Sequence, residues 1–315
     1  MDRLDSMIQQ LLGLERIDTN DTIMLREQLT SVRNEAIEIQ FPAYKARDYI
    51  PLKSNTNTGA NFVEFKILER QGRSKIVADY AKDFPRIGLV GTSHIGTVKS
   101  LGASYGFSVQ EIRNAAFAGE PLSSRLATAA KQAIVEQENR IAWFGNAENR
   151  LYGVFNNPNV PRALAPAGVG GIAWELKTPN EIIADMNQIV NGVSTNSLGV
   201  FTANVLLLPL SAYNLITSTP RSAVSDTTIY DWFLRNNPYI KTISWLNELE
   251  AASTTGNRMA MAYQLDKNVL ELDVPQDFEI FPEQTEGMEM KYPCHSRIAG
   301  VHIYQPLAVN FLEDF

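Results

Sequence analysis

Three histidines and one cysteine are the side chains with the clearest chemical potential: His94, His295, His302 and Cys294. A thiol beside an imidazole can form a nucleophile and its base. Cys294 and His295 are neighbours in a segment that is predicted to be β, where successive side chains point to opposite faces. We therefore expect a buried structural cysteine beside a surface histidine, and the nucleophile is the less favoured alternative.

Ligand clusters for metals or phosphates are also hard to find. His295 and His302 are seven residues apart in a β segment and His94 is remote in sequence, which disfavours a metal site. The glycines between Gly168 and Gly171 lack both the following Lys-Ser/Thr and the preceding apolar strand of a phosphate-binding loop. The acidic residues between 271 and 289 are too widely spaced for a calcium loop. The sequence thus predicts no catalytic, cofactor-binding or metal-binding residue.

The composition excludes several classes of protein. The chain has 315 residues, and its 28 Lys+Arg against 35 Asp+Glu leave a net charge of −7. This length fits about two structural units, and the ordinary apolar content argues against disorder. A single cysteine cannot close a disulfide within the chain. The net charge disfavours a dedicated nucleic-acid binder, though not a protein that encloses nucleic acid. Without a signal sequence or a sufficiently apolar run, the chain is expected to be soluble in a reducing compartment.

The elements that would position these residues begin with two segments too thin to be stable alone. Residues 1–44 show helical spacing of apolar residues, including Leu4, Ile8 and Leu11. Residues 62–67 alternate apolar and charged side chains, as in a strand with one wet face, and a β-rich return is expected over 89–104. An isolated two-stranded ribbon is only marginally stable in water. We expect both segments to lie on a neighbouring subunit.

A charged loop over residues 70–88 connects the two strands of this predicted ribbon. Both signs of charge are interleaved, so the loop is either a solvated surface or a set of ion pairs with a neighbouring subunit. The predicted contact residues, together with those of the N-terminal segment, are Leu4, Ile8, Leu11, Arg70, Arg73, Lys75, Asp79, Lys82 and Asp83. Exposed pairs of this kind contribute only ~0–1 kcal/mol each, so they would set geometry more than affinity.

The middle of the chain carries clear helix signals. Ser108 and Glu111 form a capping-box pair for a short helix. A long helix is predicted over about 121–144, with an apolar stripe from Leu122 through Ala130 and Ile134 to Gln137, Ile141 and Phe144. Gly145 is placed to end this helix in a left-handed conformation. Residues 151–174 are expected to form an ordered loop.

The remainder is predicted to be an α/β unit over 176–290, followed by β structure over 297–311. Thr178, Pro179 and Glu181 mark a sharp helix start, and Gly192 is expected to end that helix. A fully apolar strand over 205–208 precedes helices that begin near Pro209 and at about 226–236. Further strands are expected at 240–246, 259–265 and 269–273.

This order of parts resembles the major capsid proteins of tailed bacteriophages, the Hong Kong 97-type fold that encapsulin shells share. The resemblance rests on the strand pattern of residues 62–67 with its return through Gly96, on the helix that ends at Trp143-Phe144-Gly145, and on the closing segment from Cys294 through Pro306. It implies an α+β fold divided into an N-terminal arm (1–58), an extended loop called the E-loop (59–98), a peripheral domain with a long spine helix (99–175), an axial domain (176–287) and a closing peripheral β segment (288–315).

The resemblance implies a non-enzymatic shell protein that assembles through hexamers and pentamers into an icosahedral phage head, without cofactors. Its partners would be copies of itself, portal, scaffolding and decoration proteins, and enclosed double-stranded DNA that is not read by sequence, with no membrane involved. It would reside in the virion after assembly in the host bacterial cytoplasm. The resemblance further implies that this chain is not processed. Crosslinks occur in some relatives through a lysine of the E-loop; Lys75 and Lys82 are candidates by position only, and solvated lysines are the favoured interpretation. An encapsulin-like compartment and a soluble α/β hydrolytic enzyme remain as alternatives.

Overall fold

The computed structural model describes residues 42–53, 56–76, 84–118, 122–222, 224 and 226–315. The chain divides into two compact units, residues 1–43 and 44–315, of which the second is described here. The expected contact residues Leu4, Ile8, Leu11, Asp79, Lys82 and Asp83 therefore lie outside the described residues, as do the helices expected over residues 1–41.

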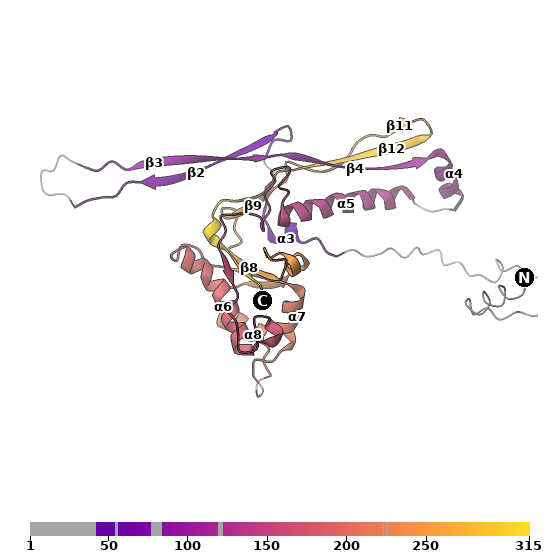
Figure 1. Cartoon of the computed structure of the whole chain (residues 1–315). Helices are drawn as coiled ribbons and strands as arrows, with labels where there is room; N and C mark the ends of the chain where they lie inside the picture. Colours follow the sequence, from indigo (N-terminus) through magenta and orange to yellow (C-terminus); the bar gives the residue numbers. More distant parts are fainter. Residues whose placement is uncertain (1–41, 54–55, 77–83, 119–121, 223, 225) are drawn as a thin grey trace, which may run out of the picture. The chain divides into compact units, whose positions relative to one another are not determined.

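A long two-stranded ribbon extends from the rest of the second unit (Figure 1). Strands β2 (Phe62–Gln71) and β3 (Gly88–Thr97) pair antiparallel along their whole length, from Phe62 opposite Thr97 to Gln71 opposite Gly88. The predicted strand over 62–67 is thus confirmed and continues to Gln71. The predicted return is divided, because a second strand, β4 (Lys99–Ser108), follows β3 and joins another sheet.

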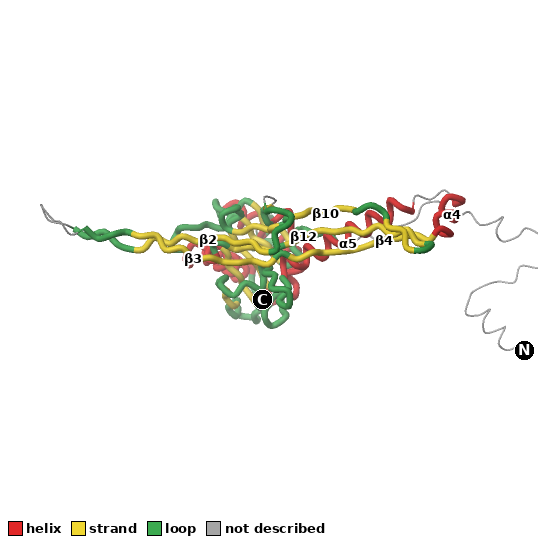
Figure 2. Tube along the Cα trace, turned by 90° about the horizontal axis from the view of Figure 1, so that it is seen from above, coloured by secondary structure: helices red, strands yellow, loops and turns green. Residues whose placement is uncertain are grey.

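That sheet is built on the pairing of β4 with β12 (Glu289–Ile298), which runs antiparallel over ten residue pairs. Two short strands, β10 (Gln276–Ile280) and β11 (Gln284–Glu286), pair with β12. Helix α4 (Val109–Ala118) begins at the predicted capping box, where Glu111 N donates to Ser108 Oγ (3.1 Å) and Ser108 N donates to Glu111 Oε2 (2.8 Å). Helix α5 (Leu122–Phe144) runs beneath these strands (Figure 2).

The long helix α5 ends as predicted but buries a different stripe at its C-terminal end. Gly145 adopts φ +69° directly after the helix, in the left-handed region that favours glycine. Ala130, Ile134 and Ile141 are buried, whereas Gln137 and Phe144 are exposed. Asn139 is buried in their place, because its Oδ1 accepts hydrogen bonds from Ala46 N (3.0 Å) and Trp143 Nε1 (3.2 Å).

A five-stranded sheet forms the centre of the second unit, in the order β5-β14-β8-β6-β7. Its strands are β5 (Arg162–Leu164), β6 (Val205–Leu208), β7 (Thr242–Trp245), β8 (Met259–Tyr263) and β14 (Val309–Glu313). Alternate residues face two separate cores, which explains why β6 is wholly apolar. Leu206 and Leu208 pack beneath α6 (Pro179–Asn196), α7 (Leu210–Ser218) and α8 (Ile229–Asn236).

The opposite core contains Val205 and Leu207 together with a three-stranded sheet, in the order β1-β9-β13. Its strands are β1 (Leu52–Lys53), β9 (Leu270–Asp273) and β13 (Gly300–Ile303). The short helices α3 (Ala46–Tyr49), η1 (Trp174–Leu176), η2 (Asn247–Ala251) and η3 (Pro306–Ala308) complete the fold. Strand β14 lies inside the five-stranded sheet, whereas β10 and β11 pair with β12, the partner of β4.

One helix boundary predicted from the sequence is wrong. Helix α6 begins at the predicted Thr178–Glu181 capping box but continues through Gly192 to Asn196. Gly192 faces Asn310 of β14, whose Nδ2 donates to Ile189 O (2.9 Å), and a Cβ at Gly192 would stand only 2.2 Å from that nitrogen. The glycine therefore permits close packing of the helix on the sheet and does not end the helix.

Candidate functional site

The structure separates the two residues that sequence reasoning considered as a nucleophile and base. Cys294 is buried against Ala130 and Ile134, and burial raises the pKa of its thiol. His295 lies on the other face of β12, with its ring 5.9 Å from that of Phe281. A buried thiol with a raised pKa and no adjacent base is a poor nucleophile. Within the described residues, no three His, Cys, Asp or Glu side chains are grouped so that they could hold a metal ion.

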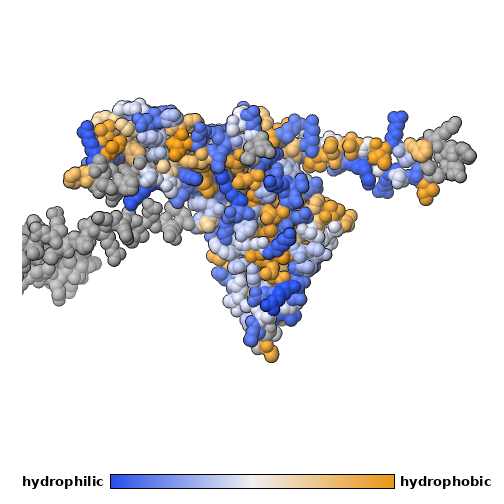
Figure 3. Space-filling model, turned by 180° about the vertical axis from the view of Figure 1, so that it is seen from behind, coloured by the Kyte–Doolittle hydropathy of each residue, from blue (hydrophilic) through white to orange (hydrophobic). Residues whose placement is uncertain are grey.

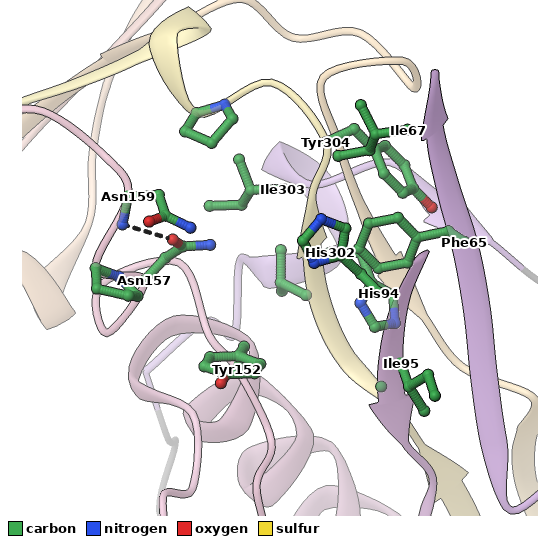
Figure 4. A pocket seen from close by; sticks show the side chains of 14 residues that line it. Phe65, Ile67, His94, Ile95, Tyr152, Asn157, Asn159, His302, Ile303 and Tyr304 are labelled. Carbon is green, nitrogen blue, oxygen red and sulfur yellow. Dashed lines mark hydrogen bonds between the residues drawn. The ribbon is translucent and has the colours of Figure 1, made fainter. Parts of the chain in front are cut away.

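The two other histidines meet at the base of the ribbon, which the sequence did not predict. Phe65 of β2 stacks on His94 of β3, with ring centroids 5.3 Å apart. The same Phe65 ring lies 5.4 Å from His302 and meets Tyr304 edge-on at 5.0 Å. Figure 4 shows these rings beside one another. The view of His94 as remote was therefore wrong, because folding joins segments more than 200 residues apart.

These rings form one wall of a cavity of about 260 Å³ (Figure 4). The other wall is the loop that carries Tyr152, Asn157 and Asn159. The cavity therefore lies between the ribbon and the loop, beside β13.

His302 is the most enclosed titratable group at this place. It is only 5% exposed, its Nε2 has no hydrogen-bond partner, and burial lowers its pKa to about 4. Gly96 of the ribbon lies directly against the ring, because a Cβ at Gly96 would stand 2.5 Å from His302 Cε1. Tyr304 Oη donates to Glu271 Oε2 (3.1 Å), and Lys53 Nζ lies 3.9 Å from the same oxygen. The ribbon base thus rests close to several ionisable groups.

From its base to its outer part, the ribbon exposes many large apolar side chains (Figure 3). They include Phe62, Leu68, Ile76, Phe84, Ile87, Leu89, Val90 and Ile95, and Ile76 is fully exposed. Arg70, Arg73 and Lys75, which the sequence predicted as contact residues, lie exposed on the same part of the chain. Apolar surface of this extent on a thin element indicates a contact with another molecule.

An acidic edge lies elsewhere in the unit, on the sheet formed by β10, β11 and β12. Glu279, Glu283, Glu286 and Glu289 are all exposed there. Glu283 accepts a hydrogen bond from Tyr292 Oη (2.7 Å), and Lys291 lies 3.9 Å from Glu286. These four of the seven acidic residues between 271 and 289 are thus exposed on this sheet, whereas Asp273 is buried in β9.

The family model described as "Major capsid protein" matches residues 72–314. A search of curated protein sequences finds no match. None of the described helices has the length and apolar character needed to cross a membrane.

Among solved structures, the chain is similar to the capsid of Myoviridae phage XM1, with a TM-score of 0.81 and 15% identity over 93% of this chain and 99% of that one. It is also similar to a chain from Mycobacterium phage Adephagia (TM-score 0.61, 12% identity, 93% and 99% coverage). The virus-like particle from Pyrococcus furiosus is a further match (TM-score 0.55, 14% identity, 84% and 91% coverage). At these identities the likeness shows the fold.

Proposed function

Because this chain belongs to the major capsid protein family, we propose that copies of it assemble through hexamers and pentamers into an icosahedral phage head around double-stranded DNA. The family is one of structural shell proteins, and the fold is that of tailed-phage capsids. For this chain the proposal rests on one observation: the apolar side chains of the ribbon are exposed in the single copy.

The apolar side chains of the ribbon are best covered by a second copy. Burying apolar surface contributes about 25 cal/mol per Å², so covering the exposed apolar side chains of the ribbon would contribute substantially to assembly. A ribbon that lies on a different surface of the next copy makes a heterologous contact, and such contacts close into rings when the rotation permits. We also propose Leu4, Ile8 and Leu11 as contact residues, because they are the apolar residues of a segment that is expected to be too thin to be stable alone.

Charge gives the ribbon contact a direction. Arg70, Arg73 and Arg86 are exposed on the outer part of the ribbon, whereas Glu283 and Glu286 lie on the acidic sheet edge. Complementary charges mainly determine orientation and register. We propose that the outer ribbon of one copy lies along the acidic edge of the next, with Lys75, Asp79, Lys82 and Asp83 in the same contact.

A charge-swap experiment tests this arrangement. Arg70→Glu with Arg73→Glu should reduce the yield of particles seen by negative-stain microscopy and sedimentation. Adding Glu283→Lys and Glu286→Lys should restore part of the yield, while the acidic-edge pair alone should be as defective as the ribbon pair. This pairing would be rejected if the ribbon pair, the acidic-edge pair and their combination all reduced the particle yield equally while circular dichroism stayed normal.

The N-terminal segment allows a second test. Deleting residues 1–40 should leave the unit of residues 44–315 folded, because that unit has its own cores. Stable shells should nevertheless be lost, since the apolar residues of the deleted segment are proposed to lie on a neighbour. Normal particles from the truncated chain would contradict this role.

The proposed shell contains DNA by enclosure. A net charge of −7 gives little general attraction to phosphates, and tight phosphate contacts would resist both packaging and release. Free subunits should bind duplex DNA with a Kd weaker than about 10⁻⁵ M at physiological salt. Gel-shift titrations at several salt concentrations check this, and submicromolar binding with a steep salt dependence would contradict it.

The likeness to the Pyrococcus furiosus particle keeps an encapsulin-like compartment as the second candidate. Purified particles distinguish the two, because a head contains DNA and a compartment contains protein cargo. We further propose that portal, scaffolding and decoration proteins are partners of the shell, that the protein resides in the virion and that assembly takes place in the host cytoplasm.

A further inference from the structure

We propose that the base of the ribbon is a proton-sensitive joint, in which neutral His302 holds the ribbon against β13 and protonated His302 releases it. This device concerns the single subunit and is not required by the proposed shell function. It is carried by the contact of Gly96 with the His302 ring and by the enclosed Nε2 atom.

The joint is small, so one group can influence it. Below the ring contacts of Phe65, a cluster of only Val63, Val98 and Ala299 buries apolar surface between ribbon and body. Polar contacts add Thr97 Oγ1, which donates to Asn149 O (3.1 Å), and Arg297 Nη2, which donates to Asn61 Oδ1 (3.0 Å). Strand β13, on which the ribbon rests, is tied to the loop because Val301 N donates to Tyr152 O (2.7 Å).

Protonation of His302 is unfavourable while the ribbon is docked. A charged ring needs a hydrogen-bond acceptor or water at each nitrogen, and Nε2 is enclosed without either a partner or exposed surface. Moving the ribbon away removes Gly96 and Phe65 from the ring and lets water reach it. The proton is therefore bound preferentially in the released state.

The ionisable groups around His302 do not provide a free counter-ion. Glu271 lies opposite His302 in the β9–β13 register, but its carboxylate accepts from Tyr304 and lies near Lys53. The positive charge of Lys53 lowers the His302 pKa further. His94 faces the same Phe65 ring from β3, and Tyr152 faces the cavity from the loop.

Asp273 is the remaining titratable group of this sheet, and it acts in the opposite sense. It is buried, Thr56 Oγ1 donates to its Oδ2 (2.9 Å), and burial raises its pKa. Protonation of Asp273 on acidification therefore favours the folded arrangement.

The sign and size of the effect follow from linkage. The docked-state pKa of His302, about 4, lies below the ordinary value of 6.5. The contribution of neutral His302 to docking is therefore fully present above pH 6.5 and is lost as the pH falls towards 4. If the released state has the ordinary value, the ratio of released to docked ribbon rises about 70-fold between pH 7.5 and pH 4.5.

Distance measurements between two spin labels test the joint in the full, unassembled chain. Cysteines would replace Lys66 on β2 and Lys267 on the body, which line one shallow groove, in a Cys294→Ala background. We expect a longer-distance population that grows on acidification. His302→Gln should abolish this growth, whereas His94→Gln and His295→Gln should retain it. A pH response that survives His302→Gln would overturn the proposal. The absence of a response in the spin-labelled chain with His302 intact would also overturn it.

Histidine-selective NMR titration gives an answer even if His302→Gln fails to fold. With only three histidines in the chain, each ring signal can be assigned from single substitutions. The ring of His302 should titrate near pH 4. A His302 midpoint near 6.5 with the ribbon still docked would refute the joint. Because both measurements use free subunits, a negative result leaves the shell function unaffected.

Discussion

Asn310 of β14 lies against the backbone of Gly192 in the middle of α6, and its Nδ2 donates to Ile189 O at 2.9 Å. An alanine Cβ at Gly192 would collide with that amide. Alanine normally stabilises a helix interior relative to glycine, but here overpacking should dominate. We expect Gly192→Ala to lower the free energy of unfolding by about 1–3 kcal/mol. Urea denaturation measures this, with Asn191→Ala on the exposed face as the matched control, and a stabilised Gly192→Ala would contradict the packing argument.

Helix α5 offers a test of its buried face. Ile134 is 3% exposed and packs with Ala130 and Cys294. Ile134→Asp would bury an unpaired charge and should cost roughly 3–5 kcal/mol. Ala133→Asp, one residue earlier and exposed, should cost far less. Soluble, assembly-competent Ile134→Asp protein would show that this face is not buried.

A buried ion pair joins the loop before α6 to the helix itself. Lys177 Nζ lies 2.5 Å from Asp185 Oδ2, both side chains are almost fully buried, and Trp174 Nε1 donates to the same oxygen at 2.9 Å. Asp185→Ala leaves the lysine charge uncompensated and should cost about 3–5 kcal/mol. Replacing both partners, Lys177→Met with Asp185→Leu, should cost less than the single change. Calorimetric unfolding compares the two, and a double variant that is less stable than Asp185→Ala would contradict this account.

Acid should weaken the link between α3 and β10. Arg47 donates to Asp277 through both terminal nitrogens, at 2.8 and 3.3 Å, and this holds the pKa of Asp277 below 3.8. The charged form stabilises the native state above pH 3.8, and this contribution is lost as the pH falls through the lowered value. Asp277→Asn should therefore lose less stability between pH 5 and pH 3 than the unsubstituted chain. Asp226→Asn, in an exposed loop, should behave like the unsubstituted chain, and an equal loss in Asp277→Asn would refute the assignment.

Features that depend on neighbours in sequence were predictable. The capping boxes at Ser108 and Thr178, the left-handed Gly145 and the strand alternation of 62–67 all follow from residues within a few positions. The order of such features also permitted the resemblance to phage capsid proteins. In contrast, the role of Gly192 depends on Asn310, which is 118 positions later. The meeting of His94 with His302 and the place of β14 depend equally on long-range pairing, for which local patterns hold no signal.

The position of β14 in the sheet also determines when the subunit can complete its folding. Residues 309–313 lie between β5 and β8, so β5 cannot be joined to the rest of the sheet until nearly the whole described chain has been synthesised. Pairing over about 150 residues is slow, because a long loop must close before its contacts are gained. A chain cut short before residue 309 leaves β5 without its partner and opens both cores. We therefore expect subunits to complete folding only after translation, so that unfinished chains are degraded before they can be incorporated.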